Sequence, residues 1–278
     1  MKNILKIMLM MIAIFTIAGS AVYAAEIPVS DQDQLITSSD WTEISNLQDE
    51  MKKEEPDATI DYDKALKVYV DCNLIKLQTA DTKKLTSALE SANYVWVIPF
   101  KMEKTYGMFT VAKGLPLREE AKSVLTKAEQ EEVKNHAGKW MITETAEHTV
   151  EPYYDILLEK REALSDCTRV VLVGSQPGMR QPVALGMDDE TARIWISLGY
   201  QYPVMEKIPE TQNEESGVYS FESVAEISDT YIEDSEVSTG VGVQSRSSMK
   251  YVAGIGIIVI GSILILSVLK KKKLEDYE

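Results

Sequence analysis

The feature that most constrains this chain is an uncharged apolar stretch near its C-terminus. From Tyr251 to Leu269 the sequence reads YVAGIGIIVIGSILILSVL. As a helix rising about 1.5 Å per residue, it spans roughly 28 Å, close to the ~30 Å hydrocarbon core of a bilayer. Basic residues collect on the cytoplasmic side of such a span. We therefore expect a transmembrane helix at 250–270 and a cytoplasmic tail at 271–278. Four lysines determine this orientation: Lys270, Lys271, Lys272 and Lys273.

The N-terminus predicts the same topology. Lys2 and Lys6 precede an apolar run from Ile7 to Ile17, and Val22 and Ala24 stand at the third and first positions before a cleavage point. This three-part pattern is typical of a secretory signal peptide, which we place at 1–24. The alternative is an uncleaved N-terminal anchor. Either way we expect a single-pass protein of the cell membrane, with the bulk of the chain extracytoplasmic and the C-terminus cytoplasmic.

The charge of the chain narrows its partners. It carries 29 Lys and Arg against 44 Asp and Glu, a net charge of −15. Several of the lysines lie in the signal and the tail, so the outer part is more negative still. Such a surface repels nucleic acid, which we exclude as a partner. Because no Asn-x-Ser/Thr sequon occurs, we expect a bacterial cell rather than a eukaryotic secretory route.

Composition divides the outer part into three. We expect a polar, loosely ordered N-terminal arm at 25–59, with Trp41 as its main contact, and a folded domain at 60–205. A flexible acidic stalk at 206–249 follows, because it is rich in acidic and small residues and has too little apolar surface to offset the entropy of ordering. The alternative for Val218–Ile232 is a strand or helix packed on the domain.

Hydrophobic periodicity indicates an α+β domain. The mixture of hairpins and helices favours a mainly antiparallel sheet with helices on one face, and the alternative is a mixed α/β sheet. Tyr94–Ile98 is nearly unbroken apolar, as in a strand buried on both faces. One amphipathic helix is expected over Leu117–Asn135. The other predicted strands are Ala65–Val70, Tyr106–Ala112, Trp140–Thr145, Arg169–Val173, Pro182–Met187 and Ala192–Leu198, and the other helices cover Asp81–Leu89 and Tyr153–Leu164.

The two cysteines, Cys72 and Cys167, allow two arrangements. In an oxidising compartment they can form one disulfide closing a long loop. Otherwise they are two separate buried thiols. Neither belongs to a Cys-x-x-Cys pair, so a redox or zinc-ribbon function is not indicated.

No motif in the sequence identifies a reaction. His148 with neighbouring Glu144 has the residue types of a metal site, but no His-Glu-x-x-His spacing, and a strand would alternate these side chains between faces. Gly174–Gly178 lacks the order of a nucleophile elbow and is a tight turn. The acidic run Asp188–Glu190 lacks EF-hand spacing and is a solvated hairpin tip. His136 follows a helix end. We therefore predict no catalytic, cofactor-binding or metal-binding residue.

These observations favour a binding or assembly module on the outer face of the membrane, with another envelope or membrane protein as partner. We expect no enzymatic activity as the leading case. One alternative is a cell-envelope hydrolase without a linear motif, which requires convergent polar groups with shifted pKa values. The other is an accessory or sensor subunit of a membrane complex.

Overall fold

The computed structural model of the chain describes residues 27–148, 150–174, 176, 179, 181–200 and 217–232. The signal peptide, transmembrane helix and cytoplasmic tail predicted from the sequence lie outside this part. Within it, no helix has the length and apolar character needed to cross a membrane.

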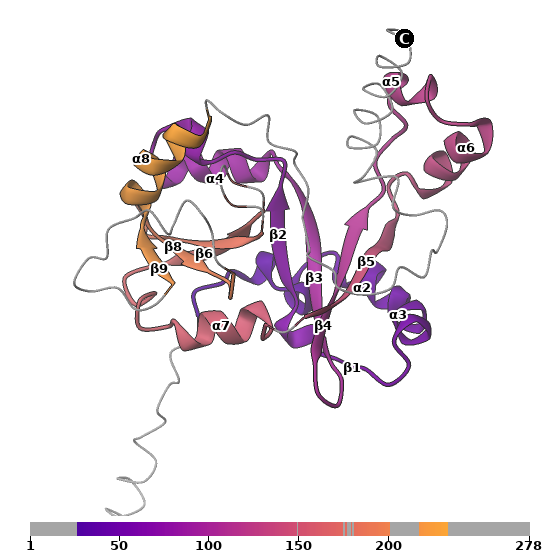
Figure 1. The fold of residues 1–278 in the computed structure, drawn as a ribbon, viewed down its shortest axis with the longest axis horizontal. Coiled ribbons are helices and arrows are strands. Elements are labelled where there is room, and N and C mark those ends of the chain that lie inside the picture. The colour runs from indigo at the N-terminus through magenta and orange to yellow at the C-terminus, as the bar shows by residue number, and fades with distance from the viewer. Residues whose placement is uncertain are drawn as a thin grey trace, which may run out of the picture.

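The strands of the described chain form one sheet, ordered β5-β4-β3-β2-β6-β7-β8-β9, with β1 paired beside β3 (Figure 1). Every neighbouring pair is antiparallel except the central pair, β2 and β6, which is parallel. Two antiparallel meanders are therefore joined at one parallel seam. The strands are β1 (Thr59–Ile60), β2 (Leu66–Val70), β3 (Asn93–Lys101), β4 (Tyr106–Lys113), β5 (Trp140–His148), β6 (Arg169–Val173), β7 (Val183–Met187), β8 (Ala192–Ser197) and β9 (Val218–Ser220).

The predicted α+β fold with a mostly antiparallel sheet is confirmed. Seven α-helices in the described residues accompany the sheet. They are α2 (Trp41–Ile44), α3 (Gln48–Glu54), α4 (Thr82–Glu90), α5 (Glu119–Lys122), α6 (Lys127–His136), α7 (Tyr153–Glu159) and α8 (Phe221–Ile232). β9 and α8 fall within the range assigned from the sequence to the stalk. Phe221 and Val224 of α8 are nevertheless buried against the sheet.

Helices cover both faces of the sheet, so the expectation of helices on one face is wrong. Leu85 and Leu89 of α4 pack on one face, which we call the α4 face, together with α8. Leu157 of α7 packs on the opposite face, the α7 face, with Val95 and Val97 of β3. The reason is that β3 is apolar on both sides, and each apolar side of a sheet must be covered.

The N-terminal segment, residues 27–58, is part of the folded domain. Leu35, Ile44 and Met51 from this segment are fully buried. They pack against Trp96 and Phe109 on the side of β3 opposite Val95 and Val97. The segment predicted as a loosely ordered arm therefore covers the meander formed by β2 to β5. Trp41, its expected main contact, packs only at the margin of this cluster.

A buried carboxylate connects this segment to both strands of the parallel seam. Asp33 is only 2% exposed. Its carboxylate accepts hydrogen bonds from Tyr69 Oη on β2 at 2.7 Å, Arg169 Nη2 on β6 at 3.0 Å, and Ser30 Oγ at 2.7 Å. Lys67 Nζ on β2 lies 3.6 Å from it. One acidic side chain thus holds three chain segments, and two cationic side chains depend on it for their counter-charge.

A second carboxylate, Asp40, lies beside the same cluster. It accepts hydrogen bonds from Tyr94 Oη at 2.9 Å and Trp96 Nε1 at 3.0 Å. The ammonium of Lys67 sits 4.6 Å from the centroid of the Tyr94 ring and 5.2 Å from that of Trp96, within cation–π range. Burial lowers the pKa of Lys67, whereas burial and the bond to Asp40 raise the pKa of Tyr94. The aromatic rings and the two acids together enclose one cation.

We predict that Asp33→Ala lowers the free energy of unfolding by about 3 kcal/mol, because Lys67 and Arg169 then lose their buried counter-charge. Asp31→Ala is the matched control: Asp31 is exposed, two residues away in the same 3₁₀ turn. Chemical denaturation of the full chain in detergent measures both. Equal losses of stability for the two variants would contradict the role assigned to Asp33.

Candidate partner-binding edge

The two cysteines lie on opposite faces of the sheet, and both thiols are free. Cys72 packs against the cluster under α4, and Cys167 belongs to the cluster under α7. The structure therefore has two separate thiols rather than a disulfide. Burial raises the pKa of each to about 11. Because the thiolate is the nucleophilic form, neither side chain is activated for chemistry.

The acidic run at Asp188–Glu190 forms the tip of the β7–β8 hairpin, as its sequence indicated. Asp188 Oδ1 accepts hydrogen bonds from the backbone N–H of Glu190 at 2.8 Å and of Thr191 at 2.6 Å, and its other oxygen pairs with Arg193. These backbone bonds lower the pKa of Asp188. Its oxygens are thus occupied in shaping the turn. Among the described residues, no three His, Cys, Asp or Glu side chains gather as a metal site would require.

Of the turn at Gly174–Gly178, the structure describes Gly174 and Gln176. The Gln176 amide is buried: it accepts a bond from the Leu74 N–H at 2.9 Å and donates to the Cys72 carbonyl at 2.7 Å. Gln176 therefore joins the segments that follow β2 and β6, which supports a structural role.

His148 has a partner that sequence reasoning missed. Its Nδ1 lies 3.3 Å from Tyr200 Oη, and the Glu144 carboxylate is close enough to raise the pKa of that phenol, after the larger effect of burial. Burial lowers the pKa of His148 and raises that of Glu144. Glu147, the neighbour of His148 in sequence, alternates to the other side of β5. Tyr200 lies after β8, so no local pattern connected it with His148.

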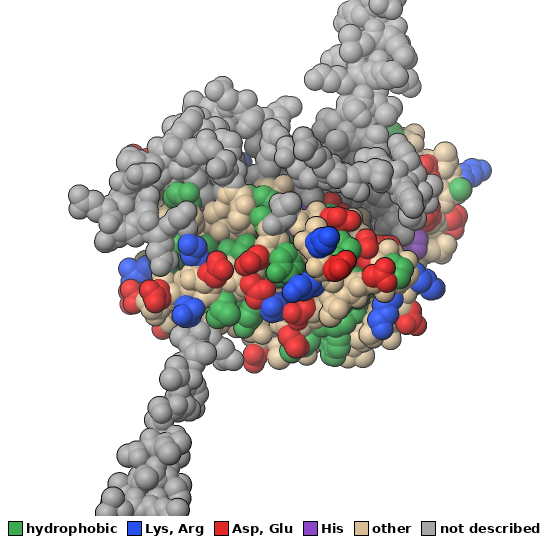
Figure 2. Space-filling view, turned by 60° about the horizontal axis from the view of Figure 1, so that its bottom comes forward, with side chains coloured by type: hydrophobic (Ala, Val, Ile, Leu, Met, Phe, Trp, Pro, Cys, Tyr) green, Lys and Arg blue, Asp and Glu red, His purple; other side chains and the backbone are tan. Residues whose placement is uncertain are grey.

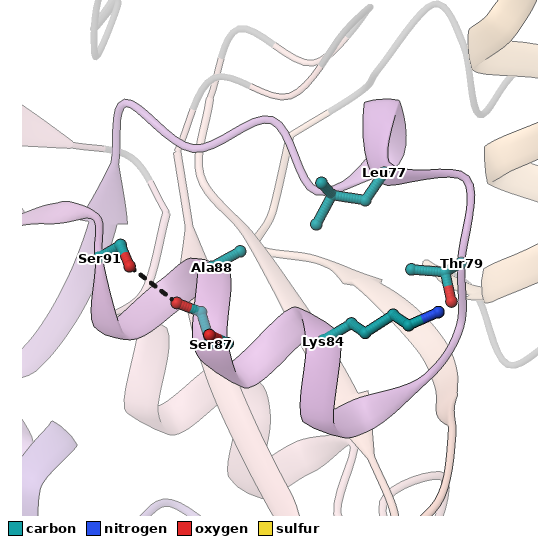
Figure 3. Close-up of a pocket in the computed structure, with 6 residues that line it drawn as sticks. All are labelled: Leu77, Thr79, Lys84, Ser87, Ala88 and Ser91. Carbon is teal, nitrogen blue, oxygen red and sulfur yellow. Dashed lines mark hydrogen bonds between the residues drawn. The ribbon is translucent and has the colours of Figure 1, made fainter.

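A shallow depression lies between α4 and the loop before it (Figure 3). It is open to solvent and has a volume of about 460 Å³. Four of its six lining residues are polar, but the Ser91 hydroxyl donates to the Ser87 carbonyl at 3.0 Å. An open hollow of this kind lacks the convergent polar groups of a small-molecule site. The lining residues are Leu77, Thr79, Lys84, Ser87, Ala88 and Ser91.

The face of the molecule shown in Figure 2 does not suggest a binding site by its charge or apolar character. Acidic, basic and apolar side chains are mixed over the described surface shown in Figure 2, without a large patch of one kind.

The β5 strand is the long open edge of the sheet. It has nine residues and pairs with β4 alone. In the described part of the chain, no backbone hydrogen bond outside the β4 ladder involves Trp140–His148. The pairing shifts at Thr143, since Ile142 faces Val111 and Glu144 faces Thr110. Beyond this bulge Glu144–His148 is a regular stretch, and its outer peptide groups have no strand partner among the residues that the structure describes.

Carboxylates flank this edge on both faces of the sheet. On the α4 face, the exposed Glu147 is near Glu54 and Glu55, which lie at the end of α3. The Thr145 hydroxyl donates to Glu54. Burial and then the charges of Glu147 and Glu54 raise the pKa of Glu55. Glu144 faces the α7 side. None of these four carboxylates belongs to an ion pair among the described residues.

An insertion, Gly114–Lys139, projects from the sheet between β4 and β5 (Figure 1). The single helix expected over Leu117–Asn135 is wrong: α5 and α6 are separate short helices. Thr126 begins α6 with a capping box, in which its hydroxyl and the Glu129 side chain satisfy each other's backbone N–H groups. This cap starts a new helix and breaks the expected one.

The apolar side chains of the insertion are not buried. Val124 is 44% exposed, and no residue of α6 is buried. The remaining large apolar residues are only half-buried: Leu115, Leu117, Leu125 and Val133. The insertion thus carries an apolar surface that its own fold does not use.

The base of the insertion is closed by backbone contacts around Gly114. Its N–H donates to the Lys139 carbonyl at 2.9 Å, and its carbonyl accepts from the Gly138 N–H at 2.8 Å. A Cβ on Gly114 would lie 2.1 Å from the His136 carbonyl oxygen. Only glycine permits this approach, which fixes the insertion to the end of β4 and the start of β5.

We predict that Gly114→Ala lowers the free energy of unfolding by about 2 kcal/mol, because the added methyl group must open the base of the insertion. Gly174→Ala is the control, since its Cβ would meet neighbours at 3.5 Å or more; we expect a change below about 0.5 kcal/mol. Denaturation and protease cleavage within 114–139 measure the effect. An intact, protease-resistant insertion in Gly114→Ala would refute it.

No family model, curated protein or solved structure matches the chain.

Proposed function

We propose that the chain is a single-pass membrane-anchored protein whose extracytoplasmic domain binds another envelope or membrane protein. The observation that carries this proposal is the α5–α6 insertion, with Val124 exposed at its surface. The membrane attachment rests on the sequence, through Tyr251–Leu269 and the lysines that follow. The same geometry serves a free-standing assembly module or an accessory subunit of a membrane complex.

The insertion has the properties of a contact element. Exposing apolar surface to water costs about 25 cal/mol per Å², and Val124 and Leu77 are the most exposed large apolar side chains that the structure describes. The base at Gly114 nevertheless holds the insertion in one place, so its half-exposed leucines and valines are presented on a fixed projection. Apolar side chains left partly exposed among charged ones occur at protein-binding surfaces.

Tethering explains how a modest surface can suffice. Two proteins held in one membrane meet at an effective concentration far above their bulk concentration. Weak binding by a small apolar insertion is then enough for a stable association. This consideration favours a partner in the same membrane or close to its outer face over a soluble one.

We predict that a photoreactive side chain at position 124, in full-length protein in native membranes, yields a discrete crosslinked adduct. The same group at position 77 is the matched control, because Leu77 has the same 44% exposure but lies beside α4. With the crosslinker moved to position 125, Val124→Asp should reduce the adduct at least about 10-fold by charging the contact. Gel mobility and mass spectrometry measure the adduct. No adduct from position 124, or equal adducts from 124 and 77, would refute the proposal.

The cluster at His148 supports a second candidate, the cell-envelope hydrolase. A His with a lowered pKa is neutral near pH 7 and can accept a proton, and Glu144 with a raised pKa is the companion that acid–base chemistry needs. Tyr200 would orient the imidazole through its hydroxyl.

For this candidate we predict turnover of an envelope peptide or glycan that falls about 10²-fold or more in His148→Gln. His136→Gln is the control, since it makes the same change at the other histidine, on α6. Assays of the full chain against such substrates decide it. No turnover by the unaltered protein, or an equal loss in both variants, would eliminate the hydrolase.

A further inference from the structure

We infer that the outer edge of β5 binds an extended, basic segment of the partner protein, which adds to the sheet as a further strand beyond β5. The inference rests on the proposed binding function and names the chemistry of the partner. It draws on the β5 backbone and its flanking charges rather than on the α5–α6 insertion.

One side of the β5 backbone has no strand partner in the described chain. A strand inside a sheet uses its peptide groups on both sides, whereas β5 bonds only to β4 among the described residues. Its outer N–H and C=O groups therefore form a ready template for one more strand. Beyond the bulge at Thr143, the stretch Glu144–His148 keeps a regular register with β4, so an added strand can align along it.

The β5 edge lacks most of the features that usually protect a sheet edge from pairing with another strand. Natural sheet edges are made unsuitable for pairing by short strands, prolines, lysines or covering elements. The β5 sequence WMITETAEH contains no proline and no lysine, and it is three times as long as β9, the strand at the other end of the sheet. The bulge at Thr143 affects only the first half of the strand. The second half carries the carboxylates Glu144 and Glu147, which disfavour an acidic or apolar strand but not a basic one.

The carboxylates beside β5 favour a positively charged partner strand. Glu147 and Glu55 repel each other on one face of the edge, and Glu144 stands on the other, without cationic partners in the described part of the chain. An added strand with Lys or Arg at alternating positions would place its cations beside these carboxylates, as cross-strand pairs require.

The same charges disfavour a second copy of this chain. Pairing β5 with its own copy would bring Glu144 and Glu147 near identical carboxylates, and each chain carries a net charge of −15. Like charges opposite one another destabilise a strand pair. A basic strand from a different protein is the occupant that both the backbone and the charge favour.

The test uses the full chain in nonionic detergent and a labelled nine-residue peptide of alternating lysine and threonine. Fluorescence anisotropy should show saturable binding at low salt. Two control peptides separate the contributions: in one, glutamate replaces lysine, and in the other, alternate backbone nitrogens are methylated to remove the donors of one strand edge. We expect binding to fall at least 10-fold with either control.

Glu147→Lys should weaken binding of the lysine peptide at least 10-fold. Glu90→Lys is the matched control, because it makes the same charge change at an exposed position at the end of α4, and it should leave binding unchanged. Equal effects of the two substitutions, or equal binding of the methylated peptide, would reduce the interaction to general charge attraction and overturn the inference.

Two other results would show that a different occupant covers the β5 edge. A dimeric full chain whose dimerisation changes in Glu147→Lys but not in Glu90→Lys would show that a second copy occupies the edge. Peptide binding that appears only after proteolysis beyond residue 200 would show that a later segment of the same chain occupies the edge. Both overturn the inference, as does absence of peptide binding. If crosslinking from position 124 persists in these cases, the proposed binding function stands without strand addition; if that adduct is absent too, both fail.

Discussion

The fold depends on one buried carboxylate. In the described sheet the two meanders are joined through the parallel pair β2 and β6 alone, and that pairing extends over Val68 with Leu172 and Tyr69 with Val173. So short a seam needs support from outside the sheet. Asp33 supplies it by bonding to Tyr69 on one strand and Arg169 on the other. The N-terminal segment that carries Asp33 is therefore a structural part of the domain, and the centre of the sheet is its most constrained region.

A firmly held centre leaves the periphery for binding. The described sheet ends at β5, whose backbone groups pair with no second strand in that part of the chain and whose two faces carry carboxylates. The α5–α6 insertion projects from the same edge and is fixed at its base by Gly114. An open strand and an apolar projection therefore lie on contiguous stretches of chain, whereas the hollow beside α4 is shallow and open. Partner binding at this edge would leave the Asp33 cluster undisturbed.

Local patterns in the sequence predicted the strands but not their environment. The apolar run Tyr94–Ile98 identified β3 because burial on both sides leaves a continuous signal. The capping box of Thr126 and Glu129 is a local signal for a helix start, whereas the apolar stripe over Leu117–Asn135 predicted one continuous helix. Asp33 and Tyr200 could not be found this way, since their partners Arg169 and His148 are distant in sequence. The open edge at β5 likewise depends on strand order, which periodicity does not contain.

Amide hydrogen exchange of the free, full-length chain tests the central claim, an open β5 edge beside a clamped sheet centre. We predict that alternate amides of Glu144–His148, those directed away from β4, exchange at least 100-fold faster than their neighbours. The amides of Val68–Val70 and Val171–Val173 at the seam should be among the slowest of the protein. Uniformly slow exchange along β5 would contradict the account, because it would mean that this edge is already covered in the protein on its own.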